Sequence, residues 1–279
     1  MSFIPVYVIK LPNSFRNLEL LTNLSDLGLN FEVHEAIDGK ALNLNNIINS
    51  VNIRGCTARL GYRISNSLIG CGLSHRAVYK KAVESQYEWI LILEEDAILT
   101  NFLPSQIFEV IQASGPTPTI VQLFSRGSRL IKLRSITKIG NGDRLLFDFM
   151  PRVVGSGASG YLINFAAMKI ALSSPKLNGA PDWPDWAQRV RQRGVYPWMI
   201  NESSVGSTIH LPSVTHSKYL LRRFAQFSGI HYFYYRKEYS RLIDYIKEEI
   251  IPYLVFVCWR LSGSKYLDQE ASGPQVLWK

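Results

Sequence analysis

The stretch WILILEEDAIL, residues Trp89–Leu99, decides the fold of this chain. Its first five residues are apolar without alternation, which predicts a strand covered on both faces of a sheet. Glu94, Glu95 and Asp96 follow at the carboxyl end of that strand, which is where ligands bind in open α/β sheets. Because adjacent carboxylates repel one another, we expect a cation above them. An alternative stays open, since acids after a strand can lie in a solvated loop or face the N-terminal amides of a helix.

The residues before this stretch predict a βαβ unit, and therefore the start of a parallel sheet. Ile4–Ile9 form a short β-rich run. Ser14 then offers an N-cap for a helix whose leucines recur at every third residue and which Gly28 closes. Phe31–Ala36 return to extended character.

The remaining segments carry weaker patterns. Leu42–Ser67 lack periodicity and are expected to form a polar excursion, and Ser74 is expected to cap the helix that leads into the central strand. Asn164 is expected to cap a helix that runs to about Leu172. A loose alternation around GNGD predicts a hairpin. The further strands that we expect are Ile120–Phe124, Leu130–Ile136 and Leu145–Phe149.

Composition limits the kinds of protein that this can be. The 279 residues are 47% hydrophobic and 19% charged, which is typical of one large or two small globular domains. The net charge of +9 favours an anionic partner, whether nucleic acid, an anionic lipid surface or a phosphorylated ligand. Cys56, Cys71 and Cys258 lack C-x-x-C spacing, so we expect neither a disulfide framework nor a zinc site. The N-terminal residues lack the basic segment of a signal peptide, which favours the cytoplasm.

Five segments occur in the order and spacing of one enzyme family: VYVIKLPNSFRN, FEVHEAIDGKAL, IGCGLSHRAVYKKA, WILILEEDAIL and GASGYLINFAAMKI. Over about Ile4–Trp186 the chain resembles glycosyltransferase family 25, which contains bacterial lipooligosaccharide galactosyltransferases. The resemblance implies a GT-A-like α/β fold for nucleotide-sugar binding, with a mainly parallel central sheet. It also implies inverting transfer of galactose from UDP-galactose to a lipooligosaccharide or lipopolysaccharide acceptor, in a β-1,4 linkage. UDP-glucose or another UDP-hexose is the alternative donor, because one hydroxyl orientation separates galactose from glucose.

The resemblance implies a chemical role for the acidic triplet. A divalent cation held by carboxylates stabilises the negative charge that develops on a UDP leaving group, and hard oxygen ligands suit Mn²⁺ or Mg²⁺. We assign Asp96 as the principal metal ligand and Glu94 as a second ligand or a ribose contact. By analogy with other GT-A enzymes His216 completes the metal shell, with a structural role as the alternative. The family usually has Glu-Asp-Asp where this chain has Glu94-Glu95-Asp96, which keeps open a transferase that has lost activity.

By the same resemblance, contacts with the sugar donor are expected in four places. These are the residues after the first strand, the turn after the second strand, the start of the helix expected from Ser74, and the acidic triplet. Ordinary structural roles remain alternatives, such as a turn at Asp38 or a buried hydrogen bond at His75. A helix N-terminus at Ser74 would bind phosphate. The full set of expected contacts is Leu11, Pro12, Arg16, Asp38, Gly39, Ser74, His75, Glu94 and Glu95.

Inversion requires a base that takes the proton of the acceptor hydroxyl on the side opposite UDP. The segment APDWPDW offers Asp182 and Asp185, of which we favour Asp182. Its two tryptophans present faces that suit the apolar C–H surface of a sugar ring. The alternative is that an Asp here only caps a helix ending at Gly194.

The chain changes character after His216, which predicts a catalytic domain over residues 1–216 and a helical, basic-aromatic appendage over residues 217–279. The apolar run Ile250–Leu261 is shorter than the roughly 20 residues that span a bilayer as a helix. We expect the appendage to bind the anionic cytoplasmic leaflet of the inner membrane peripherally, beside a lipid-linked oligosaccharide acceptor. Helix packing on the core is the alternative. The basic residues involved are Arg222, Arg223, Arg236, Lys237 and Arg241.

A different class of function also fits the basic, aromatic composition, namely a module that binds single-stranded RNA. The acidic triplet argues against it, because three carboxylates repel phosphate unless a metal is present. We therefore expect no nucleic-acid partner.

Overall fold

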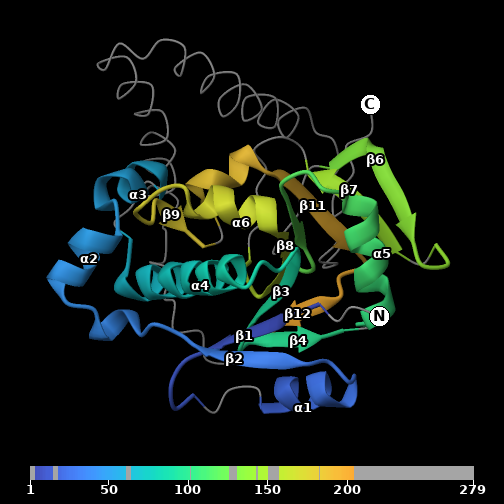
Figure 1. The fold of residues 1–279 in the computed structure, drawn as a ribbon, viewed down its shortest axis with the longest axis horizontal. Coiled ribbons are helices and arrows are strands. Elements are labelled where there is room, and N and C mark those ends of the chain that lie inside the picture. Colours follow the sequence, from blue (N-terminus) through green and yellow to red (C-terminus); the bar gives the residue numbers. More distant parts are fainter. Residues whose placement is uncertain are drawn as a thin grey trace, which may run out of the picture.

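The computed structural model describes residues 4–14, 18–60, 64–100, 102–125, 131–142, 144–149, 157–181 and 183–203. At its centre is an eight-stranded sheet with the strand order β2-β1-β3-β8-β5-β11-β7-β6 (Figure 1). Its strands are β1 (Val6–Lys10), β2 (Phe31–Glu35), β3 (Trp89–Glu94), β5 (Thr119–Gln122), β6 (Ile131–Ile139), β7 (Arg144–Phe149), β8 (Gly160–Asn164) and β11 (Arg191–Tyr196). Two short antiparallel pairs accompany it: β4 (Ala97–Leu99) with β12 (Ile200–Glu202), and β9 (Gly179–Ala180) with β10 (Trp183–Pro184).

Helices cover both faces of the sheet and make a three-layer α/β fold (Figure 1). One face carries α4 and α6, which contact each other, and the other face carries α1 and α5. Two short helices, α2 and α3, form a smaller core with the start of α4. The helices are α1 (Leu18–Asp26), α2 (Leu44–Ser50), α3 (Ile53–Leu60), α4 (Asn66–Glu84), α5 (Pro104–Ser114) and α6 (Phe165–Leu172), with 3₁₀ turns η1 (Gly39–Ala41) and η2 (Asp185–Arg189).

The central strand β3 is buried on both faces, as its unbroken apolar run predicted. Ile90 and Ile92 belong to the core under α4 and α6, whereas Leu91 and Leu93 belong to the core under α1 and α5. All four side chains are 0% exposed. Burial of each contributes about 1.5–3 kcal/mol, so the position of this strand is strongly determined.

The prediction of a mainly parallel sheet is wrong, because the sheet is mixed. Parallel pairing joins β2, β1 and β3, and again β5 and β11. The other four pairings are antiparallel, because β8 and β7 run against the remaining strands. The short link between β6 and β7 permits only an antiparallel hairpin. All five residues of β8, GYLIN, are buried. A strand that is buried throughout has no sequence pattern that indicates whether it runs parallel or antiparallel to its neighbours.

The prediction for Leu42–Ser67 is also wrong, because these residues form α2, α3 and the start of α4. The helix expected from Ser74 begins eight residues earlier, at Asn66, where the Ser65 hydroxyl accepts a hydrogen bond from the Leu68 amide at 3.3 Å. Glycines inside α4 made the earlier start look unfavourable, since glycine is a poor helix former.

Close packing explains these helical glycines. A Cβ on Gly70 would lie 2.6 Å from the Gly39 amide nitrogen and would also strike the Ile37 carbonyl oxygen. A Cβ on Gly72 would lie 2.8 Å from the Cδ2 atom of Leu177. The absence of a side chain at Gly70 therefore lets the backbone of the η1 loop lie directly on α4.

Several local predictions are confirmed. The hairpin exists as β6 and β7, and its first strand continues to Ile139. The Asn164 side chain caps α6 by accepting a hydrogen bond from the Ala167 amide at 3.0 Å. Gly28 follows α1 with a φ of 66°, a conformation that glycine adopts without strain.

The prediction of a helix that ends at Gly194 is wrong. A single 3₁₀ turn, η2, occupies the residues after Pro184, and Gly194 lies within strand β11. In the described part of the chain, no helix is both long enough and apolar enough to span a membrane. The predicted boundary at residue 216 and the appendage over residues 217–279 lie outside the described residues.

The packing at α4 predicts unequal effects for two alanine substitutions. Gly70→Ala meets rigid backbone and is expected to lower the free energy of unfolding by about 1–3 kcal/mol. Gly72→Ala is the matched control, because it meets only the end of the flexible Leu177 side chain and gains helix propensity. Urea unfolding of both variants measures the difference, and equal stabilities would contradict the packing described here.

Candidate functional site

A cavity of about 320 Å³ lies at the carboxyl ends of β1, β2 and β3. These strands are parallel, and Ile9 of β1 pairs with Glu94 of β3, so their ends meet at one edge of the sheet. The wall comes from the chain after β1, the loop after β2, one side of α4, and the acidic triplet. It is lined by Ile9, Leu11, Pro12, Asn13, Ala36, Ile37, Asp38, Gly39, Lys40, Ser67, Cys71, Ser74, Glu94, Glu95 and Asp96.

The acidic triplet is held by its backbone. Glu94 ends β3, and Glu95 and Asp96 form the turn to β4. The Glu94 amide donates to the Ser159 carbonyl at 2.9 Å, and the Glu95 amide donates to the Ile9 carbonyl at 3.0 Å. A strand follows these acids, so the alternative that they face a helix N-terminus is wrong. The Asp96 carbonyl accepts from the Ser203 amide at 2.8 Å, so the backbone of all three acids is fixed at the cavity that they line.

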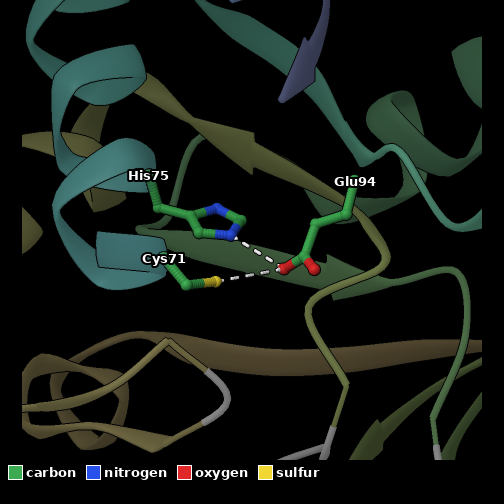
Figure 2. Close-up of side chains that lie close together, drawn as sticks. All are labelled: Cys71, His75 and Glu94. Atoms are coloured by element: carbon green, nitrogen blue, oxygen red, sulfur yellow. Dashed lines mark hydrogen bonds and ion pairs between the residues drawn. The ribbon is translucent and has the colours of Figure 1, made fainter. Parts of the chain in front are cut away.

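Behind Glu94 lies a chain of buried hydrogen bonds. The Nε2 atom of His75 is 3.0 Å from Glu94 Oε1, and its Nδ1 atom is 2.7 Å from the hydroxyl of Tyr161. The Tyr161 hydroxyl is in turn 2.6 Å from that of Tyr79. Cys71 Sγ donates to the same Glu94 oxygen at 3.6 Å (Figure 2). The Glu94 side chain is therefore oriented by two side chains of α4, His75 and Cys71, of which Cys71 also lines the cavity.

Tyr79 and Tyr161, the two tyrosines of this hydrogen-bond chain, stay neutral. Burial raises the pKa of Tyr79, and burial likewise raises the pKa of Tyr161 well above its ordinary value. A neutral phenol can donate one hydrogen bond and accept another. Tyr161 can therefore serve either protonation pattern of the imidazole ring that it contacts.

The geometry of α4 brings these side chains together. Cys71, His75 and Tyr79 are four residues apart, which places them on one face of a helix. This spacing was a usable sequence signal, but a helix that starts at Ser74 excludes Cys71 from it. Sequence reasoning therefore missed Cys71 and Tyr79, and it missed Tyr161 because that residue arrives on the distant strand β8.

Ser74 is not a helix cap, which corrects the prediction that a helix N-terminus binds phosphate here. It lies within α4, where its hydroxyl donates to the Gly70 carbonyl at 2.7 Å. The Ile37 amide donates to the same hydroxyl at 2.8 Å. Ser74 therefore fastens the loop after β2 to α4, and in this way shapes the cavity.

The turn after β2 has the structural role left open as an alternative. The Asp38 carboxylate accepts a hydrogen bond from the Lys40 amide at 2.9 Å and caps η1. Gly39 is buried, and a Cβ there would strike the Asn66 carbonyl oxygen. Both residues also line the cavity, so capping does not exclude contact with a ligand. Lys40, which is exposed, adds a positive charge to the wall.

The structure tests the other predicted residues unevenly. Leu11 and Pro12 line the cavity, whereas Arg16, Asp182 and His216 lie outside the described residues. Asp185 does not line the cavity. It opens η2, and its carboxylate accepts a hydrogen bond from the Asn178 amide group at 3.2 Å. Its role as a base remains a prediction.

Two groups of side chains around the cavity are candidate ligands for a divalent cation. Glu94, Glu95 and Asp96 offer carboxylate oxygens on a fixed backbone, which suits a hard ion such as Mn²⁺ or Mg²⁺. A second group, Cys71, His75 and Glu94, has ligand atoms that all lie within 4.8 Å of one another (Figure 2). Glu94 is common to both groups.

The family profile described as "Glycosyltransferase family 25 (LPS biosynthesis protein)" matches residues 3–176, well over half of the chain. The chain belongs to glycosyltransferase family 25. The predicted resemblance is thereby confirmed, and with it membership of a transferase family of lipopolysaccharide biosynthesis. The match contains every residue that lines the cavity and ends before Asp185.

Solved structures similar to this family 25 member are remote. The crystal structure of A197 from STIV is 13% identical, with a TM-score of 0.36, over 69% of this chain and 81% of that one. The crystal structure of a glycosyltransferase involved in the glycosylation of the major capsid of PBCV-1 is 14% identical, with a TM-score of 0.26, over 59% of this chain and 62% of that one. No curated protein matches the chain.

Removal of the Ser74 hydroxyl tests how the cavity wall is held. Ser74→Ala leaves the Ile37 amide without its acceptor and is expected to lower the free energy of unfolding by about 1–3 kcal/mol. Ser67→Ala, on the same helix and the same wall, is the control and is expected to change it by less than about 0.5 kcal/mol. Urea unfolding measures both values. Equal effects would mean that the hydrogen bond to Ile37 does not hold the loop.

Proposed function

We propose that this family 25 enzyme transfers galactose from UDP-galactose to a lipooligosaccharide or lipopolysaccharide acceptor, with inversion, in a β-1,4 linkage and with Mn²⁺ or Mg²⁺. The observation that carries the proposal is the acidic triplet, which lines a cavity at the carboxyl ends of three parallel strands and is held there by its backbone. Family membership supplies the reaction class, and the cavity supplies the place for a nucleotide sugar.

Each wall of the cavity has a role in this proposal. Leu11, Pro12, Asp38 and Gly39, which line the cavity together with the acids, bound the nucleoside. Asp96 and Glu94 hold the cation, with Glu95 beside them. When bound, the cation stabilises the charge on the departing diphosphate. The volume of about 320 Å³ lies in the range of sites that bind small ligands.

The acid–base step is assigned to the segment after β9. Asp182 is proposed as the base that takes the acceptor proton, with Asp185 as the second candidate. Trp186, which is buried and packs edge-on against Tyr79 at 6.0 Å between ring centroids, ties this segment to the hydrogen-bond chain behind Glu94. Asp185→Asn and Asp182→Asn separate the two candidates, since loss of the base lowers kcat by about 10²–10⁴.

Asp96→Ala tests the metal assignment. We expect metal-dependent UDP binding to fall by about 100-fold or more, and turnover to fall with it, because the principal ligand of the cation is lost. Asp26→Ala, at an exposed position on α1, is the control. Calorimetric titration of UDP in the presence of Mn²⁺ and assay of UDP release measure the two effects. Unchanged turnover would remove Asp96 from the mechanism.

The donor is tested by UDP release from a set of UDP-sugars in Mn²⁺, with and without a truncated lipooligosaccharide acceptor. We expect acceptor-dependent release from UDP-galactose. A preference for UDP-glucose would identify the alternative donor, because the two sugars differ in one hydroxyl orientation. No release from any UDP-sugar would contradict the proposal and favour a transferase that has lost activity.

A lipid-linked acceptor places the enzyme at the cytoplasmic face of the inner membrane, and we propose that residues 217–279 bind that surface. Each basic residue near an anionic leaflet contributes about 1 kcal/mol. Replacement by glutamine of all five basic residues, Arg222, Arg223, Arg236, Lys237 and Arg241, is expected to abolish co-sedimentation with anionic vesicles. Glutamine at the exposed Lys80, Lys138 and Lys169 is the control. Unchanged co-sedimentation of the five-residue variant would overturn the membrane proposal.

A further inference from the structure

Three chemically different ligands converge on the α4 side of the cavity. Cys71 and His75 project from consecutive turns of α4, and Glu94 reaches them from the end of β3 (Figure 2). Cys71 Sγ lies 3.6 Å from Glu94 Oε1, and His75 Nε2 lies 3.0 Å from the same oxygen. Isolated cysteines without C-x-x-C spacing predicted no zinc site, but that argument considers only cysteine partners.

These separations suit tetrahedral zinc. Bonds of about 2.3 Å to sulfur and about 2.0–2.2 Å to nitrogen and oxygen place neighbouring ligand atoms about 3.3–3.6 Å apart. The two distances to Glu94 Oε1 lie close to this range, and all three ligand atoms lie within 4.8 Å of one another, so an ion requires only small side-chain movements. Three protein ligands leave a fourth position for water or a ligand, and two of the three, Cys71 and Glu94, line the cavity.

The choice of metal follows from the donor atoms. A thiolate and an imidazole are softer ligands than carboxylates and favour Zn²⁺, whereas the oxygens of Glu95 and Asp96 suit Mg²⁺ or Mn²⁺. Cys71 and His75 thus select a different ion from the one that the acids select.

The hydrogen-bond chain behind His75 supports a metal-bound state. Metal-binding histidines commonly donate their second ring N–H to a fixed partner. Here the Nδ1 atom lies 2.7 Å from the Tyr161 hydroxyl, which can in turn donate a hydrogen bond to the Tyr79 hydroxyl at 2.6 Å. Without metal, Nε2–H donates to Glu94. With metal, the proton resides on Nδ1 and donates to Tyr161, which leaves the Nε2 lone pair for the ion.

We propose that Cys71, His75 and Glu94 form a Zn²⁺ site that is distinct from the hard-cation site at Asp96. Zinc binding displaces the thiol proton of Cys71 to solvent, while the imidazole keeps its proton by the shift from Nε2 to Nδ1. When zinc is bound, Glu94 is no longer available as a ligand for the hard cation at Asp96, and sugar transfer is therefore inhibited. This last consequence rests on the proposed function, whereas the binding of zinc does not.

Cobalt titration of the reduced full-length chain tests the site without any sugar donor. We expect a thiolate-to-cobalt charge-transfer band that Zn²⁺ displaces and that Cys71→Ser abolishes, with zinc affinity reduced about 100-fold or more through loss of the thiolate. Cys258→Ser removes a different thiol and is the control that keeps the band. Absence of the band, or its persistence in Cys71→Ser, would overturn the proposal.

Tyr161→Phe tests the hydrogen-bond chain. All three ligands remain, but Nδ1 loses its partner, so zinc affinity is expected to fall about 10–100-fold while the charge-transfer band survives. An unchanged affinity would mean that Tyr161 does not orient the histidine. Circular dichroism of each variant confirms that it is folded.

The inhibitory consequence is measured as the rate of UDP release at fixed Mn²⁺ while Zn²⁺ is raised. We expect inhibition of the wild-type chain, and in Cys71→Ser an inhibition constant at least about ten-fold higher, each relative to its own zinc-free rate. Equal inhibition of both would overturn the regulatory role. Failure of the proposed function has a different signature, namely no zinc-free turnover alongside an intact cobalt band.

Discussion

The constraint on which this structure depends is the attachment of a charged turn to a strand that is buried on both faces. Ile90, Leu91, Ile92 and Leu93 are fully enclosed by two helical layers, so β3 cannot slide without exposing apolar surface. Because Glu94, Glu95 and Asp96 follow directly at the end of this strand, their backbone is held in place with it. Backbone hydrogen bonds from Glu94 to Ser159 and from Glu95 to Ile9 add to it. The three acidic residues are therefore held at one edge of the sheet, where all three line the cavity.

Helix α4 is the second support of the site, and it serves two purposes with different side chains. Its glycine at Gly70 and its hydroxyl at Ser74 hold the backbone of the loop after β2, which forms one wall of the cavity. Its residues Cys71 and His75 contact the Glu94 carboxylate. The same helix therefore positions both a wall of the cavity and the first acid. This arrangement links the shape of the cavity to the orientation of the carboxylate.

A buried polar chain in an otherwise apolar layer requires an explanation, because unsatisfied polar groups in a core are costly. Here the cost is offset by partners at every step, from Glu94 through His75 and Tyr161 to Tyr79. The chain begins at the cavity and ends against Trp186, beside the segment that holds the candidate bases. The cavity is thus connected through the core, by hydrogen bonds and a packed aromatic pair, to Trp186, which follows Asp185 in the chain.

The sequence alone determined what local chemistry decides. A continuous apolar run predicted the buried strand β3, an alternating pair predicted the β6–β7 hairpin, and the cap at Asn164 predicted α6, because each depends on neighbouring residues. Shared segments predicted the family and most of the cavity wall. Only the tertiary structure decided the direction of β8, the true start of α4 and the meeting of Tyr161 with His75. These depend on contacts between residues distant in the chain, and a buried strand or a helical glycine has the same local pattern whichever partner it packs against.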